Sequence, residues 1–175
     1  EKGFEVICVY DGEEALSSIY ENCFDLLLLD VNVPNKNGFE VLKRAKVLGL
    51  ITENTECISV AGTHGKTTTS SLVAHLCKVA NLPFSGFLGG IAENYKSNFI
   101  YNGTEISVLE ADEYDRSFLN LSPDWAIVTS IDADHLDIYG DTETIEQSFR
   151  DFADLVPEND QLFVRKGVKI GRPCK

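Results

Sequence analysis

The sequence lacks methionine, lacks cysteine pairs with metal-site spacing, and has no apolar run long enough to cross a membrane. Its longest apolar run, Leu26–Leu29, is followed directly by Asp30, whereas a transmembrane helix needs about 20 apolar residues. The five cysteines contain no C-x-x-C pair, which favours reduced thiols over a zinc site or a disulfide framework. Because no methionine stands even at position 1, we expect the natural start to lie outside this sequence.

Basic residues are also scarce, with 15 Lys and Arg against 28 Asp and Glu and a net charge of −13. This balance argues against nucleic acid or an anionic membrane as the main partner, because both would be repelled. The N-terminus has no apolar signal region, so we expect a cytoplasmic protein. An acidic protein that binds phosphate needs a local device: backbone amides, a lysine and a divalent cation.

Apolar patterning predicts strands that alternate with helices along the chain. Such alternation is typical of an α/β fold, in which a mainly parallel sheet carries helices on both faces. A hairpin turn is predicted at residues 101–103, and Thr142 is predicted to cap the last helix. The predicted strands are 5–10, 24–33, 57–61, 106–110, 125–130 and 161–165, and the predicted helices are 13–22, 39–48, 66–79 and 142–155.

One segment between a short strand and a helix has the composition of a phosphate-binding loop. It reads Gly62-Thr63-His64-Gly65-Lys66-Thr67-Thr68. Glycines let backbone N–H groups close around phosphate oxygens, and the following helix presents its positive N-terminal end. Lys66 is predicted to reach the β- and γ-phosphates of a nucleotide, and the Thr67 hydroxyl to bind Mg²⁺. The alternative is a generic tight turn with a surface lysine, and Val60 stands where a full motif has glycine.

Acidic residues and a histidine follow the next two predicted strands. Glu110, Asp112 and Glu113 come after one strand, and Asp134 and His135 after the other. Parallel strands place their carboxyl ends at one edge, where α/β proteins build their sites. Glu110 and His135 are therefore candidate ligands of magnesium beside the phosphate loop. Each alone is more often a solvated surface residue.

Residues from about 43 to 170 resemble the central ATP-binding domain of the UDP-N-acetylmuramate–L-alanine ligases, in the Mur ligase family of peptidoglycan synthesis. The matching stretches are residues 47–52, 62–70, 87–90, 110–119 and 134–140. The resemblance implies ATP and Mg²⁺ as cofactors and phosphorylation of the UDP-N-acetylmuramate carboxylate, followed by attack of the alanine amine on the acyl phosphate. It also implies Lys66, Glu110 and His135 as catalytic residues, with Thr67 and Glu110 on one magnesium and His135 on a second. Asp112 and Asp134 would hold these ligands in place.

Residues 1–46 resemble a different family, the receiver domains of bacterial response regulators, and so predict a flavodoxin-like fragment. The resemblance rests on residues 25–38, where Asp30 ends an apolar run and Pro34 and Gly38 shape the loop. It implies Asp30 as a phosphoacceptor. The acid pair and lysine of a working receiver are missing, so charge stabilisation for phosphoryl transfer would be lacking.

The sequence thus predicts two partial units, 1–46 and 47–175, without the N- and C-terminal domains of a Mur ligase. The favoured function is Mg-ATP binding, with ligase activity in doubt. The alternatives are a phosphorelay module that uses Asp30 and a structural chimera without activity. Half a receiver cannot bury Leu26–Leu29 alone, so we expect the first unit to pack on the second or on another copy, and incomplete sheet edges to allow homo-oligomers.

Overall fold

The computed structural model describes residues 6–21, 28, 44–132, 141–158 and 161–175. The chain divides into two units, Glu1–Val47 and Leu48–Lys175. The predicted boundary, between residues 46 and 47, differs by one residue. No helix among the described residues is long and apolar enough to cross a membrane.

The second unit is built on a six-stranded sheet with the order β3-β2-β4-β1-β5-β6. All neighbouring strands run parallel except β2 and β3, which are antiparallel. The predicted α/β fold with a mainly parallel sheet is therefore confirmed for this unit. The strands are β1 (Glu56–Ala61), β2 (Phe84–Ala92), β3 (Ser97–Tyr101), β4 (Ile106–Glu110), β5 (Trp125–Val128) and β6 (Leu162–Val164).

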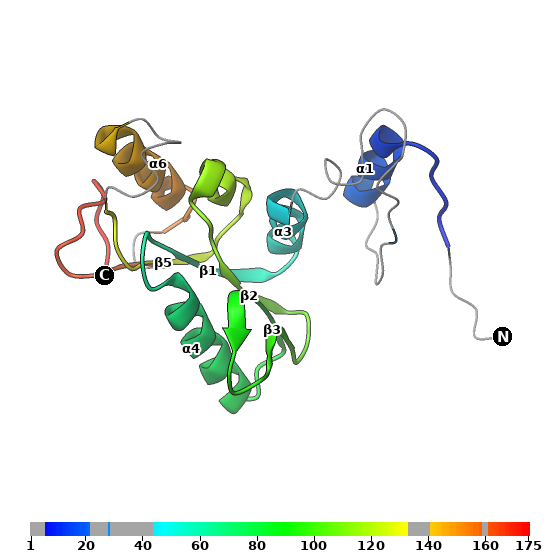
Figure 1. The fold of residues 1–175 in the computed structure, drawn as a ribbon, viewed down its shortest axis with the longest axis horizontal. Helices are drawn as coiled ribbons and strands as arrows, with labels where there is room; N and C mark the ends of the chain where they lie inside the picture. Colours follow the sequence, from blue (N-terminus) through cyan, green and yellow to red (C-terminus); the bar gives the residue numbers. More distant parts are fainter. Residues whose placement is uncertain (1–5, 22–27, 29–43, 133–140, 159–160) are drawn as a thin grey trace. The chain divides into compact units, whose positions relative to one another are not determined.

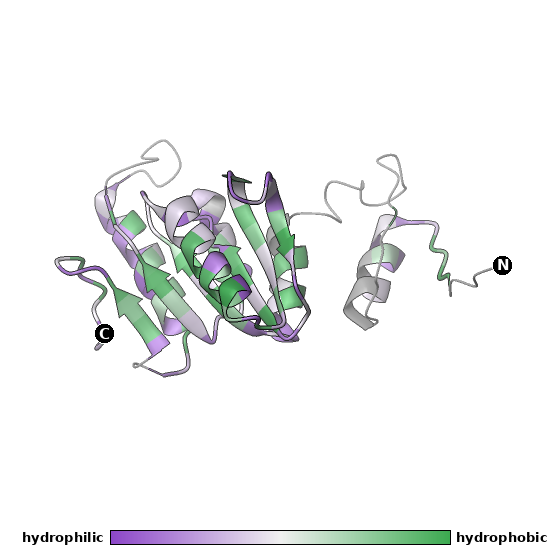
Figure 2. Cartoon of the chain, turned by 90° about the horizontal axis from the view of Figure 1, so that it is seen from below, coloured by the Kyte–Doolittle hydropathy of each residue, from purple (hydrophilic) through white to green (hydrophobic). Residues whose placement is uncertain are grey.

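Helices cover both faces of this sheet (Figure 1). Val108 of β4 packs in a cluster with Ala74 and Cys77 of α4 (Lys66–Val79). The next residue, Leu109, packs instead in the cluster of α6 (Thr142–Asp154) and the 3₁₀ helix η1 (Tyr114–Asn120). Successive side chains of a strand point to opposite faces, so two clusters on either side of one sheet follow. Figure 2 shows the apolar residues running along the strands between these layers.

The start of α6 differs from its prediction. Asp141, and not Thr142, is the N-cap, and its carboxylate accepts a hydrogen bond from the Thr144 N–H. Both residue types cap helices well, so composition alone did not separate them. The backbone conformation separates them, because Asp141 is extended, at φ −147°, as an N-cap residue typically is.

The hairpin prediction was wrong in position. Residues 101–103 connect β3 to β4, which are not neighbours, because β2 lies between them. The hairpin joins β2 to β3 instead, and its turn includes Tyr95 and Lys96, whose N–H groups donate to Ala92 O. Lys96 adopts a positive φ of 53° there without being glycine, so the usual glycine signal was absent.

In the first unit, α1 (Gly12–Glu21) forms where a helix was predicted. The strand predicted at 5–10 was wrong over its described part, since residues 6–9 are in neither helix nor strand. Val6 and Ile7 are 71% and 50% exposed, whereas the strand prediction rested on apolar side chains that a sheet would bury. Helix α3 (Arg44–Glu53) overlaps the predicted 39–48 helix over its described part. Residues 39–43 of that prediction, and the predicted 24–33 strand except for Leu28, lie outside the described residues.

Candidate functional site

Three parallel strands end side by side and deliver the predicted site segments to one edge of the sheet. Val60 of β1 lies beside Glu110 of β4, and Ala61 beside Val128 of β5. The chain beyond these residues therefore meets at a common edge, as the sequence predicted. The loop Gly62–Gly65 leaves β1 there and leads directly into α4.

Two glycines give the loop its conformation. Gly62 has φ +138° and Gly65 has φ +84°, backbone angles that residues other than glycine rarely adopt. At Gly62 the space is also closed, because a Cβ would lie 2.1 Å from Thr129 Oγ1 and 2.9 Å from Ser130 N. The loop can therefore lie against the end of β5 only with glycine at position 62.

The loop is tied to the segment that follows β5. The Thr63 N–H donates to Ser130 O at 3.1 Å, and the His64 N–H to Ser130 Oγ at 2.9 Å. The Thr63 hydroxyl donates to Asp132 Oδ2 at 3.2 Å and also lies 2.8 Å from Ser130 Oγ. Thr129 Oγ1 donates to His64 O at 2.6 Å. These bonds fix the loop backbone in one shape before any ligand arrives.

Helix α4 starts without a side-chain cap. Its N-cap residue is Gly65, and no described side chain accepts from the first turn. The first N–H groups of a helix have no partner within the helix and carry the positive end of its dipole. The start of α4 is therefore suited to an anion, unlike that of α6, which Asp141 caps.

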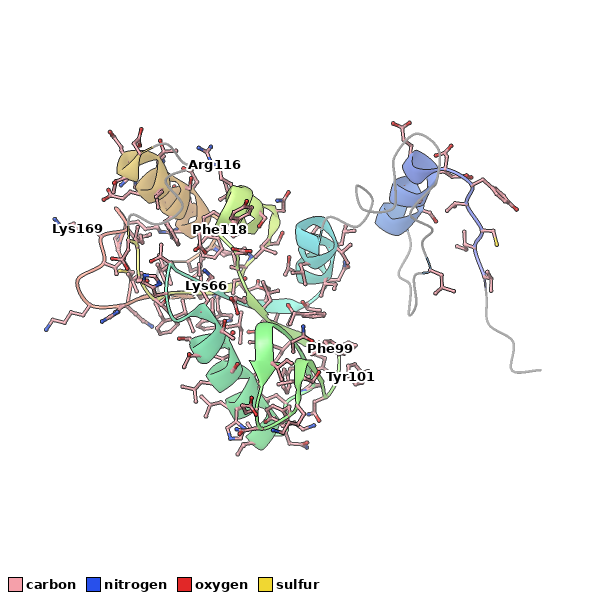
Figure 3. The ribbon with its side chains drawn as sticks, viewed as in Figure 1. Lys66, Phe99, Tyr101, Arg116, Phe118 and Lys169 are labelled. Carbon is pink, nitrogen blue, oxygen red and sulfur yellow. The ribbon has the colours of Figure 1, made fainter. Side chains whose placement is uncertain are left out.

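Lys66, the first residue of α4, turns back over the loop (Figure 3). Its ammonium donates to Gly62 O at 2.8 Å and to both carboxylate oxygens of Glu113, at 2.8 Å and 2.6 Å. The side chain of Glu113 is only 1% exposed and that of Lys66 14%. The lysine predicted to bind phosphate is thus placed at the loop and paired with a buried acid.

Glu110 and Thr67 lie against two consecutive glycines of β2. The Gly89 N–H donates to Glu110 Oε2 at 2.9 Å, and a Cβ at residue 89 would lie 2.5 Å from that carboxylate. A Cβ at Gly90 would lie 3.3 Å from Thr67 Cγ2. The structure therefore brings the two predicted magnesium ligands to the same short stretch of strand.

This donor set suits magnesium. Mg²⁺ prefers oxygen ligands and usually keeps several waters, so that one or two protein oxygens and the phosphates of a substrate suffice to hold it. A hydroxyl and a carboxylate meet that need. Within the described part of the chain, no cluster of three or more His, Cys, Asp or Glu residues could hold a metal by itself. His135 and Asp134, the predicted second-metal ligand and its partner, lie outside the described residues, as does Asp30.

The remaining predicted residues lie further from this centre. The His64 side chain is 69% exposed, with Nε2 3.9 Å from Asp132 Oδ2. Asp112 is exposed and accepts from the Tyr114 N–H at 3.1 Å, so it shapes the turn into η1. Thr68 is exposed and lines a cavity of about 260 Å³ with Ser71 and Tyr95.

A larger cavity of about 570 Å³ opens beside the loop. It lies between the start of α4 and the ends of β5 and β6, and its size is within the usual range for small-molecule pockets, about 300–1,000 Å³. Its lining includes His64, Gly65, Thr69, Thr129, Phe163 and Arg165. An apolar ring face and a guanidinium thus adjoin the phosphate loop.

Sequence reasoning missed the partners of the loop. The sequence predicts no role for Glu113 beyond its place after a strand, and it places Thr129 and Ser130 only at the end of the 125–130 strand. The one available signal was spacing, because Glu113 follows Glu110 by three residues, just beyond a strand end. The register that brings Ser130 to Thr63 appears only when β1 and β5 pair.

Comparison with known proteins identifies relatives of most of the chain. A family model described as the Mur ligase middle domain matches residues 60–172. The UDP-N-acetylmuramate–L-alanine ligase of Christiangramia forsetii is 54% identical over 135 residues, which cover 77% of this chain and 30% of that protein. The ligase of the same name from Cytophaga hutchinsonii is 43% identical over 173 residues, covering 97% of this chain and 37% of that protein.

That second match reaches into the first 46 residues. These residues thus align with a ligase of this name, and none of the matches named here supports their resemblance to a receiver domain, which stays a prediction. The chain spans about a third of the length of the curated relatives named here.

Solved structures agree on the fold. A UDP-N-acetylmuramate-alanine ligase from Thermotoga maritima matches with a TM-score of 0.59 and 28% identity, over 68% of this chain and 27% of that one. The UDP-N-acetylmuramate:L-alanyl-gamma-D-glutamyl-meso-diaminopimelate ligase from Neisseria meningitides matches with a TM-score of 0.65 over 92% of this chain and 56% of that one. At 23% identity, the second match speaks for the fold alone.

Proposed function

This chain belongs to the Mur ligase family through its middle domain, and on that premise we propose that its phosphate loop binds the polyphosphate of ATP together with Mg²⁺. The observation that carries the proposal is the start of α4, where Lys66 leans over an uncapped helix end behind a glycine loop. Backbone N–H groups and the helix dipole favour phosphate oxygens there.

In this proposal each residue has a distinct task. The loop backbone and the first turn of α4 surround the β- and γ-phosphates, and Lys66 adds a point charge. Thr67 and Glu110 hold one magnesium, and His135, which lies outside the described residues, is proposed to bind a second. Bound Mg²⁺ neutralises the charge that develops on the phosphates during transfer. Gly89 leaves the space that the Glu110 carboxylate occupies.

We place the nucleoside in the cavity beside the loop. The path from the start of α4 to this cavity runs past His64 and Gly65, both of which line it. Phe163, 39% exposed, offers a ring face against which a base can stack. Arg165, which follows the end of β6, lines the same cavity. Binding there would let the phosphates reach Lys66 while the base leaves bulk water.

For the parent enzyme we propose the reaction that the relatives' name states, the joining of UDP-N-acetylmuramate to L-alanine. ATP would phosphorylate the sugar carboxylate, and the alanine amine would then displace that phosphate. Since the chain spans only about a third of those relatives, we expect the 175-residue chain to bind Mg-ATP without measurable ligation.

Thermal melting with ATP, with Mg²⁺ and with both tests the binding. A protein whose ligand is held at one hundred times the dissociation constant gains only about 2.7 kcal/mol of stability, which for this size corresponds to a rise in melting temperature of roughly 5–11 °C. We expect a rise of that order or smaller with Mg-ATP and none with Mg²⁺ alone. Lys66→Ala should abolish the rise, whereas Glu110→Ala and His135→Ala should mainly weaken its dependence on Mg²⁺.

Lys78→Ala is the matched control, because this lysine lies at the far end of the same helix, where its ammonium donates to Asn102 Oδ1 at 2.7 Å. Each variant is compared with its own nucleotide-free melt, since Lys66→Ala also leaves Glu113 buried without its ammonium. Equal stabilisation of wild type and Lys66→Ala by Mg-ATP would refute the proposal. Product formed from UDP-N-acetylmuramate, alanine and ATP would show that the chain retains ligation.

A further inference from the structure

We propose that Glu113 is a positioning residue that occupies Lys66 in the nucleotide-free loop and gives way to phosphate oxygens when a nucleotide binds. The inference rests on the proposed function, because it concerns the same loop, and it adds a competitor for the nucleotide within the protein itself. Glu113 is neither a predicted magnesium ligand nor part of the loop.

The hydrogen-bond donors of the Lys66 ammonium are all occupied within the protein. A lysine ammonium has three N–H donors, and Lys66 Nζ has three acceptors within 2.8 Å: Gly62 O and the two oxygens of Glu113. All three donors are therefore used by acceptors of the protein itself. A phosphate oxygen can bond to Lys66 only if at least one of these bonds breaks.

Of the three acceptors, Glu113 is the one suited to exchange. Its carboxylate carries the same sign of charge as phosphate and takes two of the three donors. Gly62 O belongs to the loop backbone, which Thr63 and His64 tie to Ser130. The carboxylate and an incoming phosphate also repel each other, so both cannot remain at full contact with one ammonium.

The backbone around Glu113 keeps the carboxylate in place. Arg116 N–H donates to Glu113 O at 2.9 Å, and Phe118 N–H to Asp112 O at 2.9 Å. Phe118 is 1% exposed and anchored between Phe149 and Phe152 of α6. The carboxylate therefore approaches Lys66 from a short helix that is fixed in the core, and its own side chain is 1% exposed.

The Lys66–Glu113 pair should weaken Mg-ATP binding, and a neutral side chain at position 113 should remove that effect. Glu113→Gln keeps the size and one acceptor oxygen but loses the charge, so Lys66 is held less tightly in the empty loop. We expect this variant to bind Mg-ATP at least threefold more tightly than wild type, measured by isothermal titration calorimetry on the full chain. Its nucleotide-free melting temperature should fall, because the ion pair is lost.

The controls separate this effect from a general loosening of the fold. Glu146→Gln makes the same change at a surface acid of α6 that lies 3.4 Å from Arg150, and it should leave Mg-ATP affinity unchanged. Adenosine, which has no phosphate, should bind wild type and Glu113→Gln equally. If Glu113→Gln does not fold, Glu113→Asp retains the charge with a shorter reach, and its affinity should lie above that of wild type.

The outcomes distinguish this inference from the proposed function. If wild type binds Mg-ATP and the folded Glu113 variant binds equally or more weakly, the exchange is refuted while the nucleotide site stands. If the variant gains affinity for adenosine as much as for Mg-ATP, the exchange is likewise refuted. Should wild type bind no Mg-ATP, binding by the variant alone would support the exchange, and binding by neither would refute both.

Discussion

At the scale of single residues, Gly89 shows how one missing side chain sets the position of another. A Cβ there would lie 2.5 Å from the Glu110 carboxylate, whereas one at Gly86 in the same strand would meet its nearest atom at 3.4 Å. The first distance is far inside a normal contact and the second is ordinary. Position 89 therefore matters for the placement of Glu110, while position 86 leaves room for a methyl group.

We predict that Gly89→Ala weakens the Mg²⁺ dependence of ATP binding with little loss of stability. The Glu110 side chain can rotate away from the new methyl group, which keeps the fold but moves the carboxylate from its place. Titration of Mg²⁺ at fixed ATP measures the effect, and we expect the midpoint to rise severalfold. Gly86→Ala is the matched control and should leave the midpoint unchanged. An unchanged midpoint in Gly89→Ala would contradict this role of Glu110.

At the scale of elements, the two helices α4 and α6 begin in opposite ways. Asp141 caps α6 through the Thr144 N–H at 2.7 Å, whereas no described side chain caps α4. Hydrogen bonds from Thr144, and to a lesser extent from Glu143, hold the pKa of Asp141 below its ordinary value of 3.8. The start of α6 is thus stabilised by its own cap, whereas the start of α4 has no side-chain cap among the described residues.

The lowered pKa predicts how α6 responds to acid. Because the carboxylate is favoured in the folded state, its stabilisation is full above the ordinary value near 3.8 and is lost as the pH falls through the lowered pKa. The difference in melting temperature between wild type and Asp141→Ala should therefore shrink as the pH falls from 7 through the lowered pKa of Asp141. Asn also caps helices and does not titrate. The difference between Asp141→Asn and Asp141→Ala should accordingly stay constant, and a wild-type difference that also stays constant would contradict the charged cap.

At the scale of the whole molecule, a net charge of −13 surrounds a site proposed for a polyanion. Glu110 and Glu113 both lie at the loop, and Glu113 already pairs with Lys66. The charge of ATP is therefore opposed unless a divalent cation accompanies it. This is the physical reason to expect that ATP alone stabilises the chain less than Mg-ATP.

The distribution of the core predicts which part of the chain folds by itself. Both hydrophobic clusters of the described residues draw all their members from Leu48 onward. Helix α3 contributes to this core, since Leu48 is buried and Thr52 Oγ1 accepts a hydrogen bond from the Ser122 N–H at 3.0 Å. The expectation drawn from the sequence, that the first unit packs on the second or on another copy, is untested, and it predicts a loss of stability when the first unit is removed. The core of the described residues predicts the opposite.

We therefore predict that residues 44–175 melt cooperatively within about 4 °C of the full chain, a difference of about 1 kcal/mol or less for a domain of this size. Residues 54–175, which lack α3, should melt clearly lower because they lose Leu48 and the Thr52 bond. Thermal melts followed by circular dichroism compare the three chains. A large loss of stability in 44–175 would show that the first unit contributes to the fold after all.

The class of fold and the local chemistry of the loop could be predicted from the order of residues alone. Periodicity placed β4 and α4 at their observed bounds, because burial on one or both faces of an element leaves a repeating apolar pattern. Glycine at 62 and 65 and lysine at 66 follow one another along the chain, so their shared site was visible in the order of residues.

Which distant residues complete that site depends on how the strands pair, and no part of the sequence shows this. Strand order put β4 and β5 on either side of β1, and this brought Glu113 to Lys66 and Ser130 to Thr63. No local pattern encodes these contacts, which join residues 47 and 67 positions apart. They depend on parallel pairing between strands that the chain connects through helices, and such pairing is set by packing of the whole sheet.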